Sequence, residues 1–487
     1  MNSDFQVSNM TTKLLIQYQA EDECFSRNSE RYVKDKENQD MSEKSYHSDC
    51  AICKNYKEFE MPSDIMEASK KGKLALFCGA GISTENKNVL PESFYMTIQN
   101  ELDNTDTSMS FSETMQKYCD LPNGRRKLMK KIRERFQYIH SFPELEERAT
   151  MFHRELSELH FVKTIVTTNW DTYFEDYCAA VPITIPEDFV YWDGNERCVL
   201  KIHGSISNLG TIIATTNDYE KCREKLEKGI IGATLKTILA NNTVVFIGFS
   251  FGDEDFASIL NYLQGEMKEF LPHIYIVTLD QNLYEKIEYK NSTCIVTDGT
   301  YFLHSLKNKL IAEKLIVNSG IMGDIELQKY LVCEIHSKIA SIDFKTYPEV
   351  IYCLAYQDGI CHAFDRFIQL YKTGNYNIPG VLNGSLKAYD KITKDKKKQG
   401  NYWDASYYEG YMNGLMYILL CGEKHPMVNS FPLFYLPNTK AEMNSFESFE
   451  EELCKVSKFK GKYHKYAIKV LENLLEAEEI VVHHPPF

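Results

Sequence analysis

Short apolar runs alternate with helical patterns between about residue 73 and residue 315. Continuous apolar runs are typical of strands buried on both faces, and such strands occur in parallel sheets covered by helices on both sides. The alternation therefore predicts an α/β fold with a Rossmann-like, doubly wound parallel sheet. The predicted strands are residues 73–78, 163–168, 181–185, 198–202, 211–215, 243–250, 273–279 and 293–297.

Helical patterns fill the spaces between these runs, notably at residues 220–239, 255–264 and 301–314. More than eighty residues separate the first two predicted strands, and they include charged helical stretches at 127–135 and 144–159. We expect this insertion to form a helical layer over the ends of the strands.

The strand pattern stops after about residue 321, and helical patterns replace it. Aromatic-rich stretches at 351–371 and 402–421 are expected to be core helices, separated by the polar, basic segment 390–399. Close to the end, apolar residues recur at helical spacing, at Tyr463, Ala467, Val470, Leu471, Leu474 and Leu475.

These patterns predict three parts. Residues 1–60 are polar and form an N-terminal arm or helical leader; residues 61–318 form the α/β domain; and residues 319–487 form a mainly α-helical domain that regulates the first or binds a partner.

The composition narrows the classes of function. The net charge of −14 argues against direct nucleic-acid binding, which needs concentrated Lys and Arg. We expect a cytoplasmic protein that does not enter the membrane, because no secretory signal is visible and the longest apolar run, at 411–421, is about half of what spans a bilayer.

The 14 cysteines are scattered through predicted strands and helices, so most are expected to be reduced core residues. The spacing His47-x-x-Cys50-x-x-Cys53 is that of metal ligands, but no second pair follows nearby. A structural zinc needs four ligands. We therefore expect no metal.

The first candidate site is the sequence Gly79-Ala80-Gly81-Ile82-Ser83, which follows an apolar run directly. Glycines let the backbone approach a pyrophosphate, and the N–H groups of a helix N-terminus receive its charge. The motif alone is weak, because a tight strand-to-helix turn without a ligand has the same pattern.

Polar residues follow two further predicted strands. Asn169 and Asp171 come after the second strand, and His203 comes after the strand at 198–202. Ligands bind beyond the carboxyl ends of strands in open α/β sheets, so these side chains are expected to share one crevice. Histidine suits general-base work near neutral pH. A helix cap for Asp171 and a structural role for His203 stay open as alternatives.

A fourth candidate follows the very apolar strand at 243–250. Gly248 and Ser250 are small enough to admit a ribose or a phosphate, whereas Asp253 and Asp255 are expected to be helix caps or loop anchors.

The ordered set of these four strand ends resembles the sirtuin superfamily over about half of the chain. Its matching elements are the Gly79–Ser83 loop, Asn169-x-Asp171, His203-Gly204 and Gly248-x-Ser250. Three departures from the protein deacylases stand out. Only Cys222 lies between His203 and Thr243, where those enzymes carry two Cys-x-x-Cys pairs that bind zinc. Their Gly-Ile-Pro-Asp-Phe-Arg run is replaced here by residues 88–94, and Thr168 precedes Asn169 where they carry glutamine.

Three motifs look like those of the zinc-less, sirtuin-like NAD hydrolases of bacterial anti-phage defence. They are Thr167-Thr168-Asn169-Trp170-Asp171, Asp218-Tyr219 after a Thr run, and Gly248-Phe249-Ser250-Phe251-x-Asp253-x-Asp255. The resemblance implies that NAD is the substrate and that Asn169 and His203 are catalytic. It implies that the substrate is held by Gly79, Ala80, Gly81, Ser83, Asp171, Gly248 and Ser250. It also implies a homo-oligomer, with a partner protein or phage-derived trigger acting through the C-terminal domain. An NAD-dependent protein deacylase and a non-catalytic NAD or ADP-ribose sensor stay open as alternatives.

Overall fold

The computed structural model describes residues 57–476, except residues 88, 103–107, 193–195, 250–263, 266–267, 269–272, 281–288, 290, 372–375 and 422–430. The described residues divide into two compact units, one ending at Glu313 and the other beginning at Lys314. Each unit is described by itself. The division lies five residues before the boundary predicted at 318, which stays a prediction.

A parallel sheet of seven strands forms the centre of the first unit, in the order β3-β4-β2-β1-β5-β6-β7. This confirms the predicted α/β class with a doubly wound parallel sheet. The strands are β1 (Leu74–Cys78), β2 (Thr164–Thr167), β3 (Val181–Ile183), β4 (Cys198–Lys201), β5 (Thr243–Ile247), β6 (Ile274–Thr278) and β7 (Ser292–Val296).

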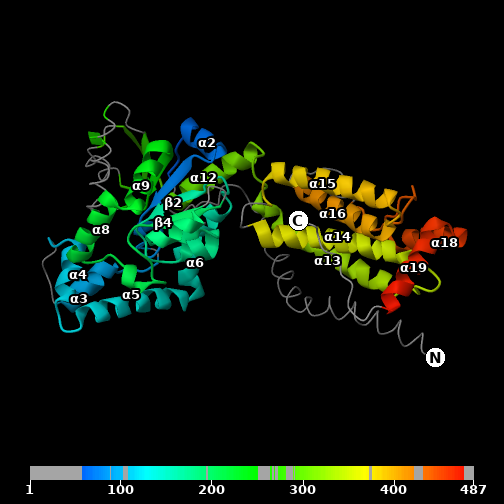
Figure 1. Ribbon diagram of the computed structural model, residues 1–487, viewed down its shortest axis with the longest axis horizontal. Helices are drawn as coiled ribbons and strands as arrows, with labels where there is room; N and C mark the ends of the chain where they lie inside the picture. The colour runs from blue at the N-terminus through cyan, green and yellow to red at the C-terminus, as the bar shows by residue number, and fades with distance from the viewer. Residues whose placement is uncertain are drawn as a thin grey trace. The chain divides into compact units, whose positions relative to one another are not determined.

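Helices cover both faces of this sheet, which explains why its central strands are apolar at successive positions. Every residue of β1 is buried. Ala75 and Phe77 face one side, where they join a core with residues of α8 (Thr216–Lys228) and α9 (Ile230–Asn241). The opposite face is covered by α2 (Ser63–Lys70), α6 (Pro143–Ser157) and α12 (Gly299–Ala312). Figure 1 shows α8 and α9 on one side of the strands and α6 and α12 on the other.

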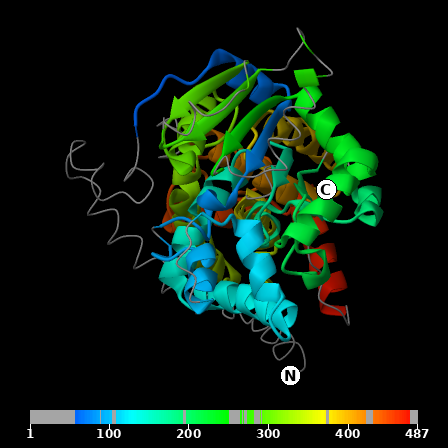
Figure 2. The same ribbon diagram turned by 90° about the vertical axis from the view of Figure 1, so that its left-hand side faces the viewer.

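The long insertion after β1 is helical, as predicted. Its helices are α3 (Phe94–Glu101), α4 (Phe111–Cys119) and α5 (Gly124–His140), and α6 then leads back to β2. They share a core with Trp170, which follows β2, and with Ile212 and Ala214, which follow β4. The insertion therefore lies over the carboxyl ends of these strands, and Figure 2 shows it as cyan helices gathered beyond one end of the sheet.

Two elements predicted in this unit are wrong. Residues 211–215 are not a strand: η3 (Leu209–Thr211) comes first, and Thr215 then caps α8, accepting from the N–H of Asp218. The helix predicted at 220–239 is divided between α8 and α9 at Gly229, which has an extended backbone and donates to the carbonyl of Lys225 at 2.8 Å.

The described elements of the second unit are helices, which confirms the predicted C-terminal helical region. Its elements are η5 (Ser319–Ile321), α13 (Met322–Ala340), α14 (Val350–Leu370), α15 (Pro379–Lys398), α16 (Tyr402–Leu420), α18 (Phe446–Phe459) and α19 (Lys462–Glu476). The basic segment predicted to separate two core helices is itself the end of α15. Its Lys396 and Lys397 form ion pairs with Asp404 and Glu409 of α16, at 2.7 and 2.6 Å.

Glycines bring α14 and α16 into backbone contact. A Cβ atom on Gly359 would lie 2.0 Å from the carbonyl oxygen of Tyr407, and one on Gly410 would lie 1.8 Å from that of Tyr356. Only hydrogen fits at these two positions, so the pair of helices packs more closely than larger side chains would permit.

Candidate functional site

The site is built where the connections of the sheet diverge. β1 and β5 are neighbours, but the chain continues from β1 toward β2 and from β5 toward β6, on opposite sides. A point of this kind is where open α/β sheets bind ligands, beyond the carboxyl ends of the strands. Residues Gly79–Ser83, called the glycine turn below, follow β1 here, and Gly248 follows β5.

Three glycines let the ends of β1 and β5 touch. The N–H groups of Gly79 and Gly81 donate to the carbonyls of Ile247 and Gly248, at 2.9 and 3.0 Å. A Cβ atom on Gly79 would lie 2.5 Å from the oxygen of Gly248. Gly248 itself has φ of +72°, and a Cβ atom there would lie 2.6 Å from Cγ2 of Ile82. These glycines thus permit a close contact between the backbone after β1 and the backbone after β5.

The helix expected directly after this turn is instead a 3-10 turn of three residues, η1 (Ala80–Ile82). The N–H groups of Ile82 and Ser83 donate to the carbonyls of Gly79 and Ala80. The next α-helix, α3, begins only at Phe94. The N-terminus of an α-helix is therefore absent from this described turn, and the expectation that one would face a pyrophosphate here is wrong.

Ser83 connects the turn to the residues that follow β2. Its hydroxyl donates to Oδ2 of Asp171 at 3.1 Å and accepts from Nδ2 of Asn169 at 3.4 Å. All three side chains are buried. The structure therefore brings together three of the predicted site residues in one hydrogen-bonded group.

Asn169 keeps one polar atom unused. Its main-chain N–H donates to Oγ1 of Thr167 at 3.0 Å, and its side-chain nitrogen is directed to Ser83. Its Oδ1 is buried and has no hydrogen-bond partner among the described residues. A buried acceptor without a partner is costly, so this oxygen is suited to a donor that a ligand or a water brings.

Asp171 lies one residue before Thr172, which is the N-cap residue of the next helix. Its Oδ1 accepts from the N–H of Tyr173, the first residue of α7 (Tyr173–Cys178), at 3.3 Å. Burial raises the pKa of this carboxyl group, and the nearby ammonium of Lys201 opposes the rise. The side chain of Asp171 thus bonds both to the first residue of α7 and to the glycine turn.

His203 follows β4 and is held by a tight turn. Gly204 has φ of +84°, and a Cβ atom there would lie 2.2 Å from the carbonyl oxygen of Thr211. The carbonyl of His203 accepts from the N–H of Ile213 at 3.0 Å, and its ring lies edge-on to Tyr219, with centroids 5.1 Å apart. His203 is 3% exposed, so the surrounding protein fixes its position.

The register of the sheet relates His203 to Asn169. Thr167 of β2 pairs with Lys201 of β4, and the N–H of Ile202 donates to the carbonyl of Thr167 at 3.0 Å. Asn169 and His203 are each two residues beyond this aligned pair. They therefore follow neighbouring parallel strands at the same carboxyl edge of the sheet.

Two residues near the site were not given a role from the sequence. Lys201 is buried within an apolar strand, where it donates to the main-chain carbonyl of Asp171 and forms an ion pair with Glu175 of α7 at 2.9 Å. Burial raises the pKa of Glu175, and Lys201 opposes that rise. A lysine inside the otherwise apolar run at 198–202 was the signal in the sequence, since a lysine in a buried strand needs a partner.

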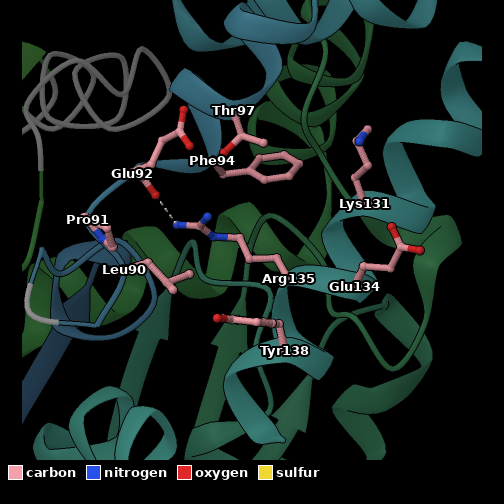
Figure 3. Close-up of a pocket in the computed structure, with 9 residues that line it drawn as sticks. All are labelled: Leu90, Pro91, Glu92, Phe94, Thr97, Lys131, Glu134, Arg135 and Tyr138. Carbon is pink, nitrogen blue, oxygen red and sulfur yellow. Dashed lines mark hydrogen bonds between the residues drawn. The ribbon is translucent and has the colours of Figure 1, made fainter. Parts of the chain in front are cut away.

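The residues that follow the glycine turn border a cavity of about 350 Å³ (Figure 3). Arg135 of α5 projects into it and donates to the carbonyls of Glu92 and Thr84, at 3.0 and 3.3 Å. The guanidinium also pairs with Glu85 at 3.0 Å. None of the predicted site residues is among those that line this cavity, which are Leu90, Pro91, Glu92, Phe94, Thr97, Lys131, Glu134, Arg135 and Tyr138.

Some predictions fall outside the described residues. They are those on Ser250, Asp253 and Asp255, on the spacing of His47, Cys50 and Cys53, on residues 1–56 of the N-terminal arm, and on residues 255–263 of the helix predicted at 255–264. Within the described ranges, His, Cys, Asp and Glu side chains do not gather in a group that could hold a metal ion. Among the same residues we find no helix with the length and apolarity that crossing a bilayer requires.

Comparison with known proteins assigns a class to this arrangement. Residues 163–297, which include Asn169, Asp171 and His203, match the family model described as a SIR2-like domain. The chain thus carries a SIR2-like domain, as the resemblance predicted. The glycine turn lies before the matched residues.

Three curated relatives extend this finding. The chain is 22% identical over 259 residues to Defense-associated sirtuin 2 of Bacillus subtilis, across 50% of this chain and 25% of the relative. It is 26% identical over 207 residues to NAD(+) hydrolase ThsA of Cytobacillus dafuensis, across 41% of this chain and 40% of the relative. It is 27% identical over 210 residues to NAD(+) hydrolase ThsA of Enterococcus faecium, across 42% of each. These are distant homologues, and the match spans less than half of their length.

Proposed function

We propose that this chain is an NAD glycohydrolase that cleaves the bond between nicotinamide and ribose, and that it depletes cellular NAD as the effector of an anti-phage system. The observation that carries the proposal is the buried Oδ1 of Asn169, which has no hydrogen-bond partner among the described residues, at the sheet edge where His203 follows the neighbouring strand. The names of the distant relatives, a defense-associated sirtuin and two NAD(+) hydrolases, support it.

In the proposed reaction, the electron pair of the breaking bond returns to the ring nitrogen, so that neutral nicotinamide leaves an oxocarbenium-like ribose. Nicotinamide needs no protonation to leave, because it is already cationic in NAD. A water molecule then adds to the ribose carbon and loses one proton. The products are nicotinamide, ADP-ribose and that proton.

The two proposed catalytic residues have separate tasks. Asn169 would use its Oδ1 to accept a hydrogen bond from a ribose hydroxyl or from the attacking water, which positions the reactants. His203 would accept the proton from the water or from a ribose hydroxyl, as a general base. Both are buried, which keeps bulk water from competing for these contacts.

The remaining assignments concern binding. Gly79, Ala80, Gly81 and Ser83 are proposed to hold the pyrophosphate, and Gly248 with Ser250 the adenosine side. Asp171 is proposed to accept from the nicotinamide carboxamide. Each oxygen of Asp171 already accepts one hydrogen bond, but an ionised carboxylate has about four acceptor positions. The helical unit after Lys314 is proposed to regulate the reaction or bind a partner.

The direct test is to incubate the purified chain with NAD alone and to follow the release of nicotinamide. Release without an acylated peptide supports the glycohydrolase. Release that requires an acyl-lysine peptide would make the protein a deacylase. Binding of NAD without turnover, together with unchanged cellular NAD after phage challenge, would make it a sensor.

A further inference from the structure

Lys201 is the last residue of β4, and its side chain is completely buried, with 0% exposure. Lysine is almost never fully buried unless its charge is paired. Lys201 lies two residues before His203. Its ammonium is therefore inside the protein, close to the candidate catalytic residues, and not at the surface.

Two contacts hold this ammonium. It donates to the main-chain carbonyl of Asp171. It also forms an ion pair with Oε1 of Glu175, at a distance of 2.9 Å. Asp171 lies in the loop after β2, two residues from Asn169, and Glu175 lies in α7. One side chain therefore joins β4 to both the loop that carries Asn169 and the helix that follows it.

Two titratable side chains lie near the ammonium of Lys201, namely those of His153 and Glu175. The imidazole of His153 is fully buried, and burial together with Lys201 lowers its pKa to about 3, so His153 is neutral near pH 7. Oε2 of Glu175 is buried and has no hydrogen-bond partner among the described residues. The carboxylate of Glu175 therefore depends on Lys201 for its compensation.

A buried ion pair alone would not indicate a role in the reaction, because such a pair is often replaceable by neutral groups without loss of stability. The bond to the Asp171 carbonyl is different, since it balances no carboxylate. It fixes the main chain at the point where Asp171 bonds to Ser83, and Ser83 in turn orients Asn169.

We infer that Lys201 is a positioning residue of the proposed NAD-cleaving site, holding the loop after β2 so that Asn169 stays oriented toward the substrate. This inference rests on the proposed function for its catalytic consequence. Lys201 acts through Asp171 and needs no contact with NAD.

The test compares three variants of the full chain. Lys201→Met removes the ammonium, and the double variant Lys201→Met with Glu175→Gln also removes the unpaired charge, so that the fold does not have to bury a lone carboxylate. The matched control is Lys307→Met: Lys307 is a buried lysine of α12 in the same unit, paired with Glu155 and Glu158 at 2.7 and 3.3 Å. The readouts are kcat and KM for NAD, and amide hydrogen exchange of residues 168–173.

We expect the double variant to fold, to lose about 100-fold in kcat with a smaller change in KM, and to exchange faster at residues 168–173. Lys307→Met is expected to leave both readouts at the wild-type level. Wild-type kcat and unchanged exchange in the double variant would overturn the inference and leave Lys201 as half of an ion pair only.

The two proposals can fail separately. A wild-type chain that releases no nicotinamide, alone or with a trigger, would remove the proposed function. The exchange of residues 168–173 would still show whether Lys201 holds that loop, because this readout needs no turnover.

Discussion

The hydroxyl of Ser83 donates a hydrogen bond to Oδ2 of Asp171 at 3.1 Å, across 88 positions of the chain. This bond connects the glycine turn after β1 to the loop after β2. Because the same hydroxyl accepts from Nδ2 of Asn169, the nitrogen of that carboxamide is directed to Ser83, and its oxygen has no donor among the residues that the structure describes. A bond between two strand ends thus orients the residue that we propose to contact the ribose.

Replacing this hydroxyl should lower turnover more than it lowers stability. Ser83→Ala leaves a buried carboxylate oxygen and a buried amide nitrogen without their partner, which we expect to cost about 1–3 kcal/mol in the free energy of unfolding. The Asn169 carboxamide then loses its orientation, so kcat for NAD should fall. Steady-state kinetics and urea unfolding measure the two effects.

The control is Ser69→Ala, because Ser69 of α2 is also buried in this unit and donates to the carbonyl of Ile65 at 2.8 Å. Its loss should affect stability but not kcat. Equal kcat in the Ser83 variant and the Ser69 variant would contradict the orienting role.

The turn after His203 should tolerate a side chain at Gly210 but not at Gly204. Gly204→Ala places a Cβ atom 2.2 Å from the Thr211 carbonyl at a φ of +84°. Such strain costs about 1–3 kcal/mol, and it displaces His203, so stability and turnover should both fall. Gly210→Ala is the matched control in the same loop, where the nearest atom would be Oδ1 of Asn208 at 3.4 Å. Similar unfolding midpoints for the two variants would count against this account of the turn.

His153 should make the first unit acid-sensitive. Burial lowers the pKa of its ring to about 3 from the ordinary value of 6.5, so the unfolded chain binds a proton in the window between these values while the folded chain does not. Stability from this residue is therefore present above pH 6.5 and is lost as the pH falls toward 3, at up to about 1.4 kcal/mol per pH unit.

His153→Phe removes the imidazole that takes up a proton on unfolding, and it keeps an aromatic ring beside Tyr173 and Phe174. The variant should lose less stability than the wild type between pH 7 and pH 4.5, as measured by urea unfolding at several pH values. His140→Gln is the control, because His140 has a side chain that is 77% exposed. Parallel pH curves for wild type and His153→Phe would refute the assignment.

Much of the fold was predictable because strands that are buried on both faces of a sheet have continuous apolar runs in the sequence. Each of the seven strands coincides with an apolar run, whereas the extra strand predicted at 211–215 is apolar for another reason: Ile212 and Ala214 pack into the core of the insertion. Gly229 divides α8 from α9 through its extended backbone, which the apolar pattern across 220–239 does not reveal.

The candidate site was predictable as a set of strand ends but not as a network. The positions of Asn169 and His203 after apolar strands indicate a shared edge of the sheet. Their placement on neighbouring strands depends on the order β4-β2-β1, which pairing across the sheet determines and local sequence does not. The contacts of Lys201 with Asp171 and Glu175 depend on that order as well, so no spacing in the sequence could have revealed them.

The central claim is tested most directly by measuring nicotinamide release from NAD by the wild-type chain, by Asn169→Ala and by His203→Ala, each shown to be folded by circular dichroism. We predict release by the wild type and, in each variant, a loss of at least about 100-fold, the scale expected when a positioned general base or its positioning partner is removed. Equal release by the wild type and both folded variants would contradict the account.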